Sequence, residues 1–408
     1  MITKLTVENF FSIADKREIS FVVDDKAPDA EYYSKQPVVD GRVSTVSLIF
    51  GPNASGKTNL LKALAFLRYF IVDSFNDKPD EKILFEDFNF PEIPHDSHTH
   101  LSVDFIIKDF LYSYTIELTK ERVYKELLSV KQFKSKRTSS SVVFSKEFNI
   151  QKKEYLLDIA DKKFPAPKQT LIRNNASIIS IGAQHNDEQM LMIQKFWDDM
   201  KINVIFSGKP DKTIKQRLSY AANYFYTHKD LHEQANTLLS TFDLGLVGTK
   251  IEQYSVPSDE SKDAQKQKYL VFGVHQTTKK KDHAFPFFME SRGTQSLFVL
   301  LYDLLPNLKQ GSVIVLDDID ETLHPMMLPK IIDIFLSKET NPHRAQLIAS
   351  AHGVHVMDRL DKYQIFLTGK NEDGVSDVWR LDELKDVRSD ISFVKKYLSG
   401  AFGGVPDV

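Results

Sequence analysis

The chain has 408 residues, of which 42% are hydrophobic and 27% charged, a composition ordinary for a globular protein with a sizeable core. This length gives room for two or three domains, or for one large domain with an insertion. The formal net charge of -3 gives no overall basic signal for nucleic acid, and the lack of cysteine excludes disulfides, thiolate catalysis and cysteine-bound zinc.

The N-terminal residues alternate between apolar and polar side chains in two runs, from Ile2 to Val7 and from Ile19 to Val22. This alternation predicts two strands joined by a turn. The first run lacks the apolar core of a signal peptide, and no apolar run in the chain approaches the roughly 18 residues of a membrane span. We therefore expect a cytoplasmic protein without contact to a membrane.

A glycine-rich segment, Gly-Pro-Asn-Ala-Ser-Gly-Lys-Thr, occupies residues 51–58. It follows an apolar, strand-like run at residues 43–50 and precedes a helix-like run from Asn59 to about Ile71, which is the context of a P-loop. A glycine-rich turn that matches by chance is the alternative. The glycines let backbone N–H groups surround phosphates at a helix N-terminus, while Lys57 would reach the β- and γ-phosphates and Thr58 would bind Mg²⁺. We predict that ATP is bound by Gly51, Asn53, Ala54, Ser55, Gly56, Lys57, Thr58 and Asn59.

The next stretch, residues 77–100, is irregular and contains three alternating histidines, His95, His98 and His100. They could gather a metal ion, although histidines in a proline-rich loop are usually solvated. Clear alternation then predicts a hairpin at residues 101–118.

Residues 120–168 carry an excess of basic side chains, and Ser139-Ser140-Ser141 indicates a loop within them. Such a segment can bind RNA, DNA or an acidic partner, or it can be a solvated surface, since few aromatic residues interleave the lysines. Residues 172–239 have mostly helical periodicity. We predict three parts, namely an N-terminal head part at 1–124, a basic and helical insertion at 125–240 and a C-terminal head part at 241–408. The basic residues are Lys131, Lys134, Lys136, Arg137, Lys146, Lys152, Lys153, Lys162, Lys163 and Lys168.

A second turn with polar side chains, Ser291-Arg292-Gly293-Thr294, opens a strongly apolar helix. Backbone N–H groups and a hydroxyl at a helix N-terminus can meet a phosphate, so Ser291, Gly293 and Thr294 are candidates for nucleotide binding. Ordinary helix capping is the alternative.

Two acidic residues, Asp317 and Asp318, follow a buried apolar strand at residues 312–316, which is the form of a Walker B motif. Asp317 would hold Mg²⁺ and Asp318 would polarise the attacking water. An acidic turn after a core strand is the alternative. A further apolar strand at residues 346–350 leads to His352, which could contact the γ-phosphate or be a structural histidine.

The order of these motifs resembles the ABC-type ATPases. More narrowly, the chain resembles stand-alone AAA family ATPases related to the SMC and OLD families of bacterial anti-phage and abortive-infection systems, and it is similar to the AbiL/RloA-like, PARIS and Septu ATPases. The resemblance implies an α/β head with a mixed sheet and a mostly helical insertion. It rests on the motifs above and on Leu5 to Phe10, Leu244-Gly245, Asp317 to Pro325 and Tyr397 to Pro406.

The resemblance also implies partners. Two heads would sandwich ATP in a homodimer or a higher symmetric oligomer, with residues 51–58 of one subunit facing Ser291–Thr294 of the other and His352 sensing the γ-phosphate. A separate effector, a toxin or a nuclease, is expected. The alternatives are a DNA-repair or chromosome-associated ATPase that binds DNA through its insertion, and a non-catalytic scaffold that only binds ATP.

Two features depart from the family pattern. Asp318 stands where the family usually has glutamate, so we expect slow hydrolysis, and Glu321 is a weaker substitute because a dimer-facing loop is expected there. No Q-loop glutamine can be assigned.

Overall fold

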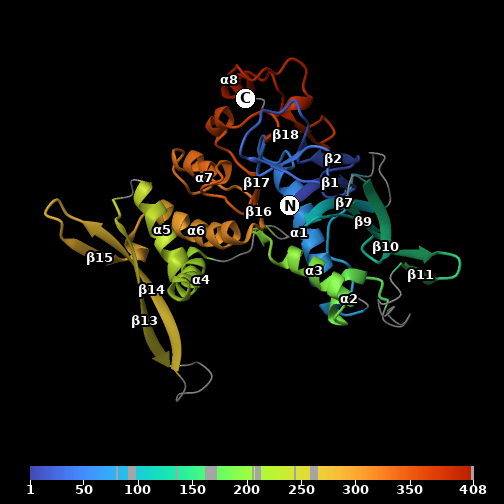
Figure 1. The fold of residues 1–408 in the computed structure, drawn as a ribbon, viewed down its shortest axis with the longest axis horizontal. Helices are drawn as coiled ribbons and strands as arrows, with labels where there is room; N and C mark the ends of the chain where they lie inside the picture. The colour runs from blue at the N-terminus through green and yellow to red at the C-terminus, as the bar shows by residue number, and fades with distance from the viewer. Residues whose placement is uncertain are drawn as a thin grey trace. The chain divides into compact units, whose positions relative to one another are not determined.

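The structure is a computed structural model that describes residues 1–79, 81–90, 98–134, 137–160, 172–204, 206, 213–242, 245–257 and 265–405. The chain divides into two compact units (Figure 1). The first contains Met1–Lys209, Gly311–Ile319 and Ile332–Val408, and the second contains Pro210–Gln310 and Asp320–Ile331. The predicted boundaries at residues 125 and 240 differ from these bounds and stay a prediction. Of the residues named above, His95, Lys136, Lys162, Lys163, Lys168, Leu244 and Pro406 lie outside the described residues.

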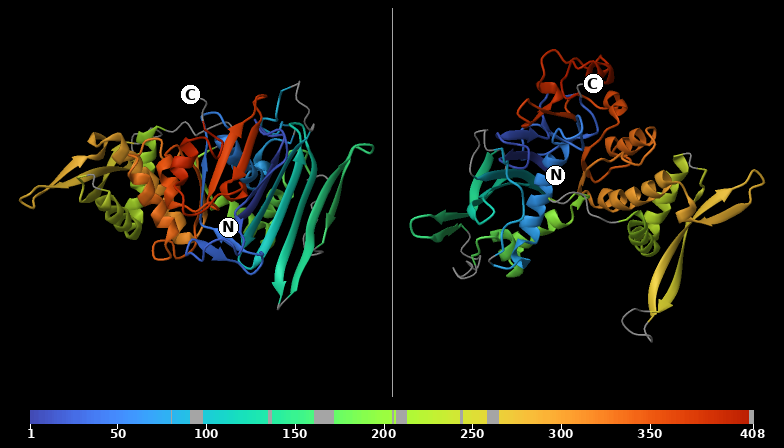
Figure 2. Two further views of the ribbon diagram at one scale, coloured as in Figure 1. Left: turned by 90° about the horizontal axis from the view of Figure 1, so that it is seen from above. Right: turned by 180° about the vertical axis from the view of Figure 1, so that it is seen from behind.

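The first unit contains a seven-stranded antiparallel sheet in the order β11-β10-β9-β8-β7-β1-β2 (Figure 2). The two predicted N-terminal strands and the predicted hairpin are both part of it. The strands are β1 (Ile2–Glu8), β2 (Arg17–Ser20), β7 (Thr99–Ile107), β8 (Phe110–Leu118), β9 (Val123–Lys134), β10 (Arg137–Asn149) and β11 (Glu154–Ile159).

Strands β9, β10 and β11 lie in the basic segment at residues 120–168, and our expectation of a loop at Ser139-Ser140-Ser141 is wrong, because these residues are part of β10. The apolar residues Leu128 and Phe144 are fully buried on the inner face, while lysines such as Lys125 lie at partly exposed positions of the same strands. The lysines on the outer face hide the alternation that identifies strands from sequence.

A six-stranded sheet in the same unit has the order β12-β16-β17-β6-β18-β19. Its first five strands are parallel, and only β19 is antiparallel to its neighbour. The carboxyl ends of the parallel strands therefore meet at one edge, which is where α/β sheets bind ligands. The strands are β6 (Val46–Phe50), β12 (Lys201–Ile202), β16 (Val313–Leu316), β17 (Gln346–Ser350), β18 (Ile365–Lys370) and β19 (Ser376–Arg380).

One hydrophobic core joins both sheets through α1 (Lys57–Val72). It includes Val103 from the antiparallel sheet, Leu64 from α1 and Ile348 from the parallel sheet. The predicted α/β fold class with a mixed sheet is confirmed. The remaining elements of this unit are β3 (Val22–Val23), β4 (Tyr33–Lys35), β5 (Arg42–Ser44), α2 (Ile178–Gln184), α3 (Glu188–Asp198), α8 (Phe393–Leu398), η1 (Ser74–Asn76), η4 (Val354–Arg359) and η5 (Leu381–Glu383).

The second unit combines helices with a small antiparallel sheet, in which β13 and β14 form a long hairpin (Figure 2). A capping box between Thr213 and Gln216 starts its first helix. The elements are α4 (Ile214–Thr227), α5 (Lys229–Thr241), α6 (Arg292–Gln310), β13 (Gly248–Pro257), β14 (Gln265–Gln276), β15 (Asp282–Pro286) and η3 (Phe287–Met289). Helix α7 (Met327–Leu336) begins in this unit and ends in the first.

None of the helices in the described parts of the chain is long and apolar enough to cross a membrane.

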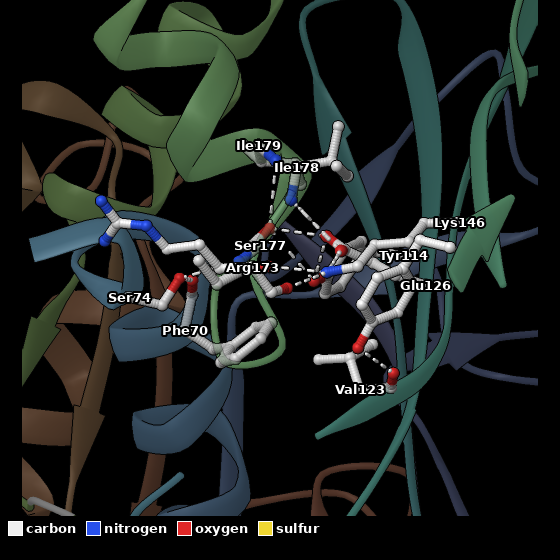
Figure 3. Close-up of polar contacts among 12 residues, drawn as sticks. Phe70, Ser74, Tyr114, Val123, Glu126, Lys146, Arg173, Ser177, Ile178 and Ile179 are labelled. Carbon is white, nitrogen blue, oxygen red and sulfur yellow. Dashed lines mark hydrogen bonds and ion pairs between the residues drawn. The ribbon is translucent and has the colours of Figure 1, made fainter. Parts of the chain in front are cut away.

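A fully buried ion pair, Glu126 on β9 and Lys146 on β10, connects neighbouring strands of the antiparallel sheet (Figure 3). The two side chains are directly opposite each other, with Lys146 Nζ 3.7 Å from Glu126 Oε2. Glu126 Oε1 accepts hydrogen bonds from the Tyr114 hydroxyl (2.9 Å), the Ser177 hydroxyl (2.6 Å) and the backbone N–H of Ile178 (3.0 Å). Glu126 therefore binds the start of α2 to the sheet.

Lys146 also forms hydrogen bonds with the segment that precedes α2. Its Nζ donates to the carbonyl oxygens of Arg173 (3.1 Å) and Ala176 (2.9 Å), and burial lowers the pKa of Lys146. We counted this lysine toward a basic surface, and that expectation is wrong for Lys146.

Replacing Lys146 with methionine is expected to lower the free energy of unfolding by about 3 to 5 kcal/mol, because Glu126 is left buried without its counter-charge. Urea denaturation followed by circular dichroism measures the loss. The matched control is Lys125→Met on the neighbouring strand β9, whose exposed pair with Glu147 is worth at most about 1 kcal/mol. Equal losses in the two variants would contradict this role of the buried pair.

Candidate functional site

The predicted phosphate-binding loop follows β6, which lies inside the parallel sheet between β17 and β18. The loop needs glycine at two positions. At Gly51 (φ 155°), a Cβ would lie 2.4 Å from Thr368 Oγ1, and at Gly56 (φ 113°) it would lie 2.5 Å from Ser376 Oγ. Asn53 and Ala54 are exposed within the loop, and Ala54 also has a left-handed backbone (φ 62°).

Helix α1 begins at Lys57, directly after Gly56. No side chain among the described residues caps this end, and the first turn holds no acidic residue. The N–H groups of the first turn and the positive end of the helix dipole are therefore available to an anion.

The ammonium group of Lys57 lies inside the loop. The residue is only 5% exposed, and its Nζ donates to the carbonyl oxygens of Gly51 (2.8 Å) and Pro52 (2.9 Å). A phosphate group in the loop would compete with these carbonyl oxygens for the same charge. The lysine is thus held close to the position where the motif requires it.

The two predicted metal ligands are in contact. Thr58 Oγ1 donates to Asp317 Oδ2 at 2.9 Å, and Asp317, directly after β16, is 2% exposed. A hydroxyl and a carboxylate are the hard oxygen ligands that Mg²⁺ takes beside phosphate oxygens. The donor set present in the structure therefore fits this ion.

Asp318 and His352 also lie together, at the carboxyl ends of neighbouring strands. His352 Nε2 is 3.1 Å from Asp318 Oδ1, and the Asp318 side chain is 24% exposed against 47% for His352. Asp318 has a left-handed backbone (φ 48°), and its N–H donates to Ser350 Oγ at 2.7 Å. The structure thus brings Thr58, Asp317, Asp318 and His352 to one edge of the sheet.

The residues at this edge of the sheet lie within a region that matches a known protein family. The family described as "AAA domain, putative AbiEii toxin, Type IV TA system" matches residues 46–358, which include the loop, both aspartates and His352. The chain belongs to this family of AAA ATPases.

Solved structures similar to this AAA ATPase include SMC head domains. The head from Thermotoga maritima is 14% identical and has a TM-score of 0.43, with 93% of this chain and 98% of that chain covered. The head with a coiled coil and joint from Pyrococcus yayanosii is 12% identical with a TM-score of 0.45, and 98% and 99% are covered. A search of curated proteins found no match.

Two polar residues that the sequence analysis missed position the aspartates of the ATPase. Asn203 lies just after β12 and forms two hydrogen bonds with the backbone of Asp317. Its Oδ1 accepts from the Asp317 N–H at 2.7 Å, and its Nδ2 donates to the Asp317 carbonyl oxygen at 3.0 Å. Ser350 Oγ donates to Asp317 Oδ1 at 2.5 Å. Ser350 ends an apolar strand and could have been noticed, whereas nothing in the sequence marks Asn203.

The side chains of two predicted nucleotide-binding residues, Ser55 and Asn59, form hydrogen bonds with other segments of the first unit. Ser55 Oγ lies 2.6 Å from Thr368 Oγ1 on β18. The Asn59 side chain donates to Ser12 Oγ at 2.7 Å, and Ser12 Oγ lies 2.7 Å from Ser376 Oγ on β19. These contacts hold the loop and the first turn of α1 against neighbouring segments.

The turn Ser291-Arg292-Gly293-Thr294, which we predicted to contact a nucleotide, lies in the second unit at the start of α6. Ser291 Oγ accepts from the backbone N–H of Thr294 at 3.1 Å and lies 2.8 Å from Thr294 Oγ1. A Cβ on Gly293 would lie 3.3 Å from the carbonyl oxygen of Thr322. Ser291 therefore caps the helix, and its role toward a nucleotide stays a prediction.

The histidine segment has other contacts. His98 Nδ1 lies 2.6 Å from Glu117 Oε1, and the His98 ring stacks on Tyr124 with centroids 4.1 Å apart. Within the described parts of the chain, no group of three or more histidine or acidic side chains could hold a metal ion.

Proposed function

We propose that this AAA ATPase binds ATP with Mg²⁺ at residues 51–58 and hydrolyses it. The observation that supports this most directly is the contact of Thr58 with Asp317 beside the pair of Asp318 and His352. A hydroxyl from the loop, a buried carboxylate and a second, more accessible carboxylate are the groups that phosphoryl transfer to water requires.

Each residue has a part in the proposed reaction. Lys57 and the N-terminus of α1 neutralise the phosphates, and Thr58 and Asp317 hold the metal ion. Mg²⁺ held by Thr58 and Asp317 would supply positive charge that stabilises the negative charge developing in the reaction. Asp318 accepts a hydrogen bond from the attacking water and orients it, and His352 donates to the γ-phosphate after separating from Asp318. Because aspartate is one methylene shorter than glutamate, we expect slow turnover.

The proposed site is completed by a second subunit, as the resemblance to ABC-type ATPases implies. Ser291, Gly293 and Thr294 of one copy would face the phosphates bound by the other, in a homodimer or a higher symmetric oligomer. ATP would then act both as substrate and as the ligand that holds two heads together.

For the role in the cell, we propose a cytoplasmic sensor or scaffold of an anti-phage system. In this proposal the ATPase restrains or releases a separate effector, a toxin or a nuclease. The proposal is supported by the resemblance to AbiL/RloA-like ATPases and by the family description, which refers to a type IV toxin–antitoxin system. The nucleotide state of the heads would decide whether the effector is held.

Cells that express the ATPase together with its proposed effector are expected to resist phage, and Lys57→Ala is expected to remove that resistance, because ATP-dependent assembly is lost. Plaque counts on matched strains measure the effect. The control is Lys82→Ala, an exposed lysine paired with Glu121, which should protect like the wild type. Full protection by Lys57→Ala, or none by the wild type, would contradict the defence role while leaving the ATPase activity testable on its own.

A further inference from the structure

A cavity of about 680 Å³ lies on the antiparallel sheet, which is not the sheet that carries the ATPase site. Its walls come from β9, β10, β11 and the segment before α2. This volume is within the usual range of small-molecule sites, about 300 to 1,000 Å³. The residues that the argument uses are Arg122, Tyr124, Phe148, Lys153, Glu154 and Tyr155.

Three aromatic rings form a row across neighbouring strands of this cavity. Tyr124 is on β9, Phe148 on β10 and Tyr155 on β11, and Phe148 and Tyr155 are direct cross-strand partners. The ring centroids of Tyr124 and Phe148 are 6.1 Å apart, and those of Phe148 and Tyr155 are 5.1 Å apart. Tyr124 and Phe148 are partly exposed, so their rings are accessible from the cavity.

The floor of the cavity is a buried ring, Tyr155, that has contacts on several sides. Tyr155 is 8% exposed, and its hydroxyl donates to the carbonyl oxygen of Val123 at 2.9 Å. Its ring lies 4.8 Å from Nζ of Lys146, the lysine of the buried ion pair. A ring held in this way keeps its orientation without loss of side-chain entropy on binding.

Positive charge lies beside the aromatic row. The guanidinium carbon of Arg122 is 4.1 Å from the Phe148 ring centroid, and Lys153 is exposed in the turn between β10 and β11. Neither cation has an ion-pair partner among the described residues. The carboxylate of Glu154 also lines the cavity, so the site is not uniformly basic.

We propose that this cavity is a second ligand site that binds a nucleotide unit. Its base stacks on the face of the Tyr124 ring opposite His98, as bases do on aromatic residues of sheet surfaces that bind single strands. Phe148 then meets the base edge to face, because its ring is turned by 86° from that of Tyr124. The phosphate of the nucleotide pairs with Arg122 and Lys153. Glu154 is placed to accept a hydrogen bond from an N–H group on the edge of the base, such as N3–H of uracil.

The ligand is a free nucleotide or a nucleotide within a single strand, because the two share the same base and phosphate. A duplex does not fit this chemistry, since its bases are stacked on each other and are not available to protein rings. The site is independent of the proposed function, because nothing in it requires ATP hydrolysis.

The test is fluorescence anisotropy of a labelled 12-nucleotide oligouridine with the full-length protein, without added ATP, so that no other nucleotide competes for the cavity. Saturable binding is expected. Tyr124→Ala should weaken it by about 5- to 150-fold, the range seen when a stacking ring is lost, whereas Tyr124→Phe should retain it. Arg122→Gln should also weaken it and reduce its dependence on salt. The matched control is Lys131→Ala, a lysine on β9 that does not line the cavity, and it should bind like the wild type.

Competition with uridine monophosphate distinguishes a site for a free nucleotide from a site for a nucleotide within a single strand. Displacement of the oligonucleotide by the free nucleotide identifies a nucleotide site, and binding of the oligonucleotide alone identifies a single-strand site. The proposal is overturned if neither probe binds saturably. It is also overturned if Tyr124→Phe weakens binding as much as Tyr124→Ala, or if Lys131→Ala weakens it as much as Arg122→Gln.

Discussion

Replacing Lys57 with alanine is expected to lower kcat/KM for ATP hydrolysis by about 100- to 1,000-fold, the range for loss of one donor that stabilises developing charge in a closed site. The ammonium of Lys57 lies inside the loop, bound to the carbonyl oxygens of Gly51 and Pro52. No other lysine or arginine lies between Gly51 and Ala65, apart from Lys62. Steady-state phosphate release, with ATP affinity measured by titration, gives both the rate and the binding contribution.

Lys62 does not replace Lys57, because its ammonium lies over the ring of Phe11 at 4.2 Å and burial lowers its pKa. The control for Lys57→Ala is again Lys82→Ala, which removes a positive charge from the exposed surface. If Lys57→Ala hydrolysed ATP within threefold of the wild type, residues 51–58 would not be the site of hydrolysis.

The sequence is informative about the candidate site because its motifs predict ligands of the same nucleotide and metal ion. Thr58 and Asp317 are 259 positions apart, yet their oxygen atoms are 2.9 Å apart. Each motif implies a ligand of the same metal ion, and a parallel sheet brings strand ends together at one edge. The pairing could therefore be predicted without knowledge of the intervening fold.

The supporting residues of the site could not be predicted in this way. Asn203 follows a strand of only two residues, and Thr368 lies inside an apolar strand. Each acts through a backbone group or a hydroxyl of another segment, and such contacts leave no periodic or compositional signal. Only the assembled sheet shows that Asn203 contacts Asp317 and that Thr368 contacts Ser55.

The antiparallel sheet shows a different limit of sequence analysis. Lysines between residues 120 and 168 indicate a solvated surface, and for exposed residues such as Lys125 that reading is adequate. Lys146 contributes to the same excess of lysine in the sequence, but its side chain is fully buried against Glu126. A buried lysine is rare, and only the register that pairs β9 with β10 places its counter-charge opposite it.

Asp318→Asn is expected to lower kcat by about 100- to 10,000-fold, the contribution of a positioned general base, while ATP affinity stays within about threefold of the wild type. Asparagine keeps the shape of the side chain but cannot take a proton from water. Single-turnover hydrolysis beside equilibrium ATP binding separates the two quantities. The control is Glu321→Gln, which should hydrolyse ATP like the wild type. Loss of turnover in Glu321→Gln and not in Asp318→Asn would assign the base to Glu321, and unchanged rates in both would mean that neither carboxylate activates the water.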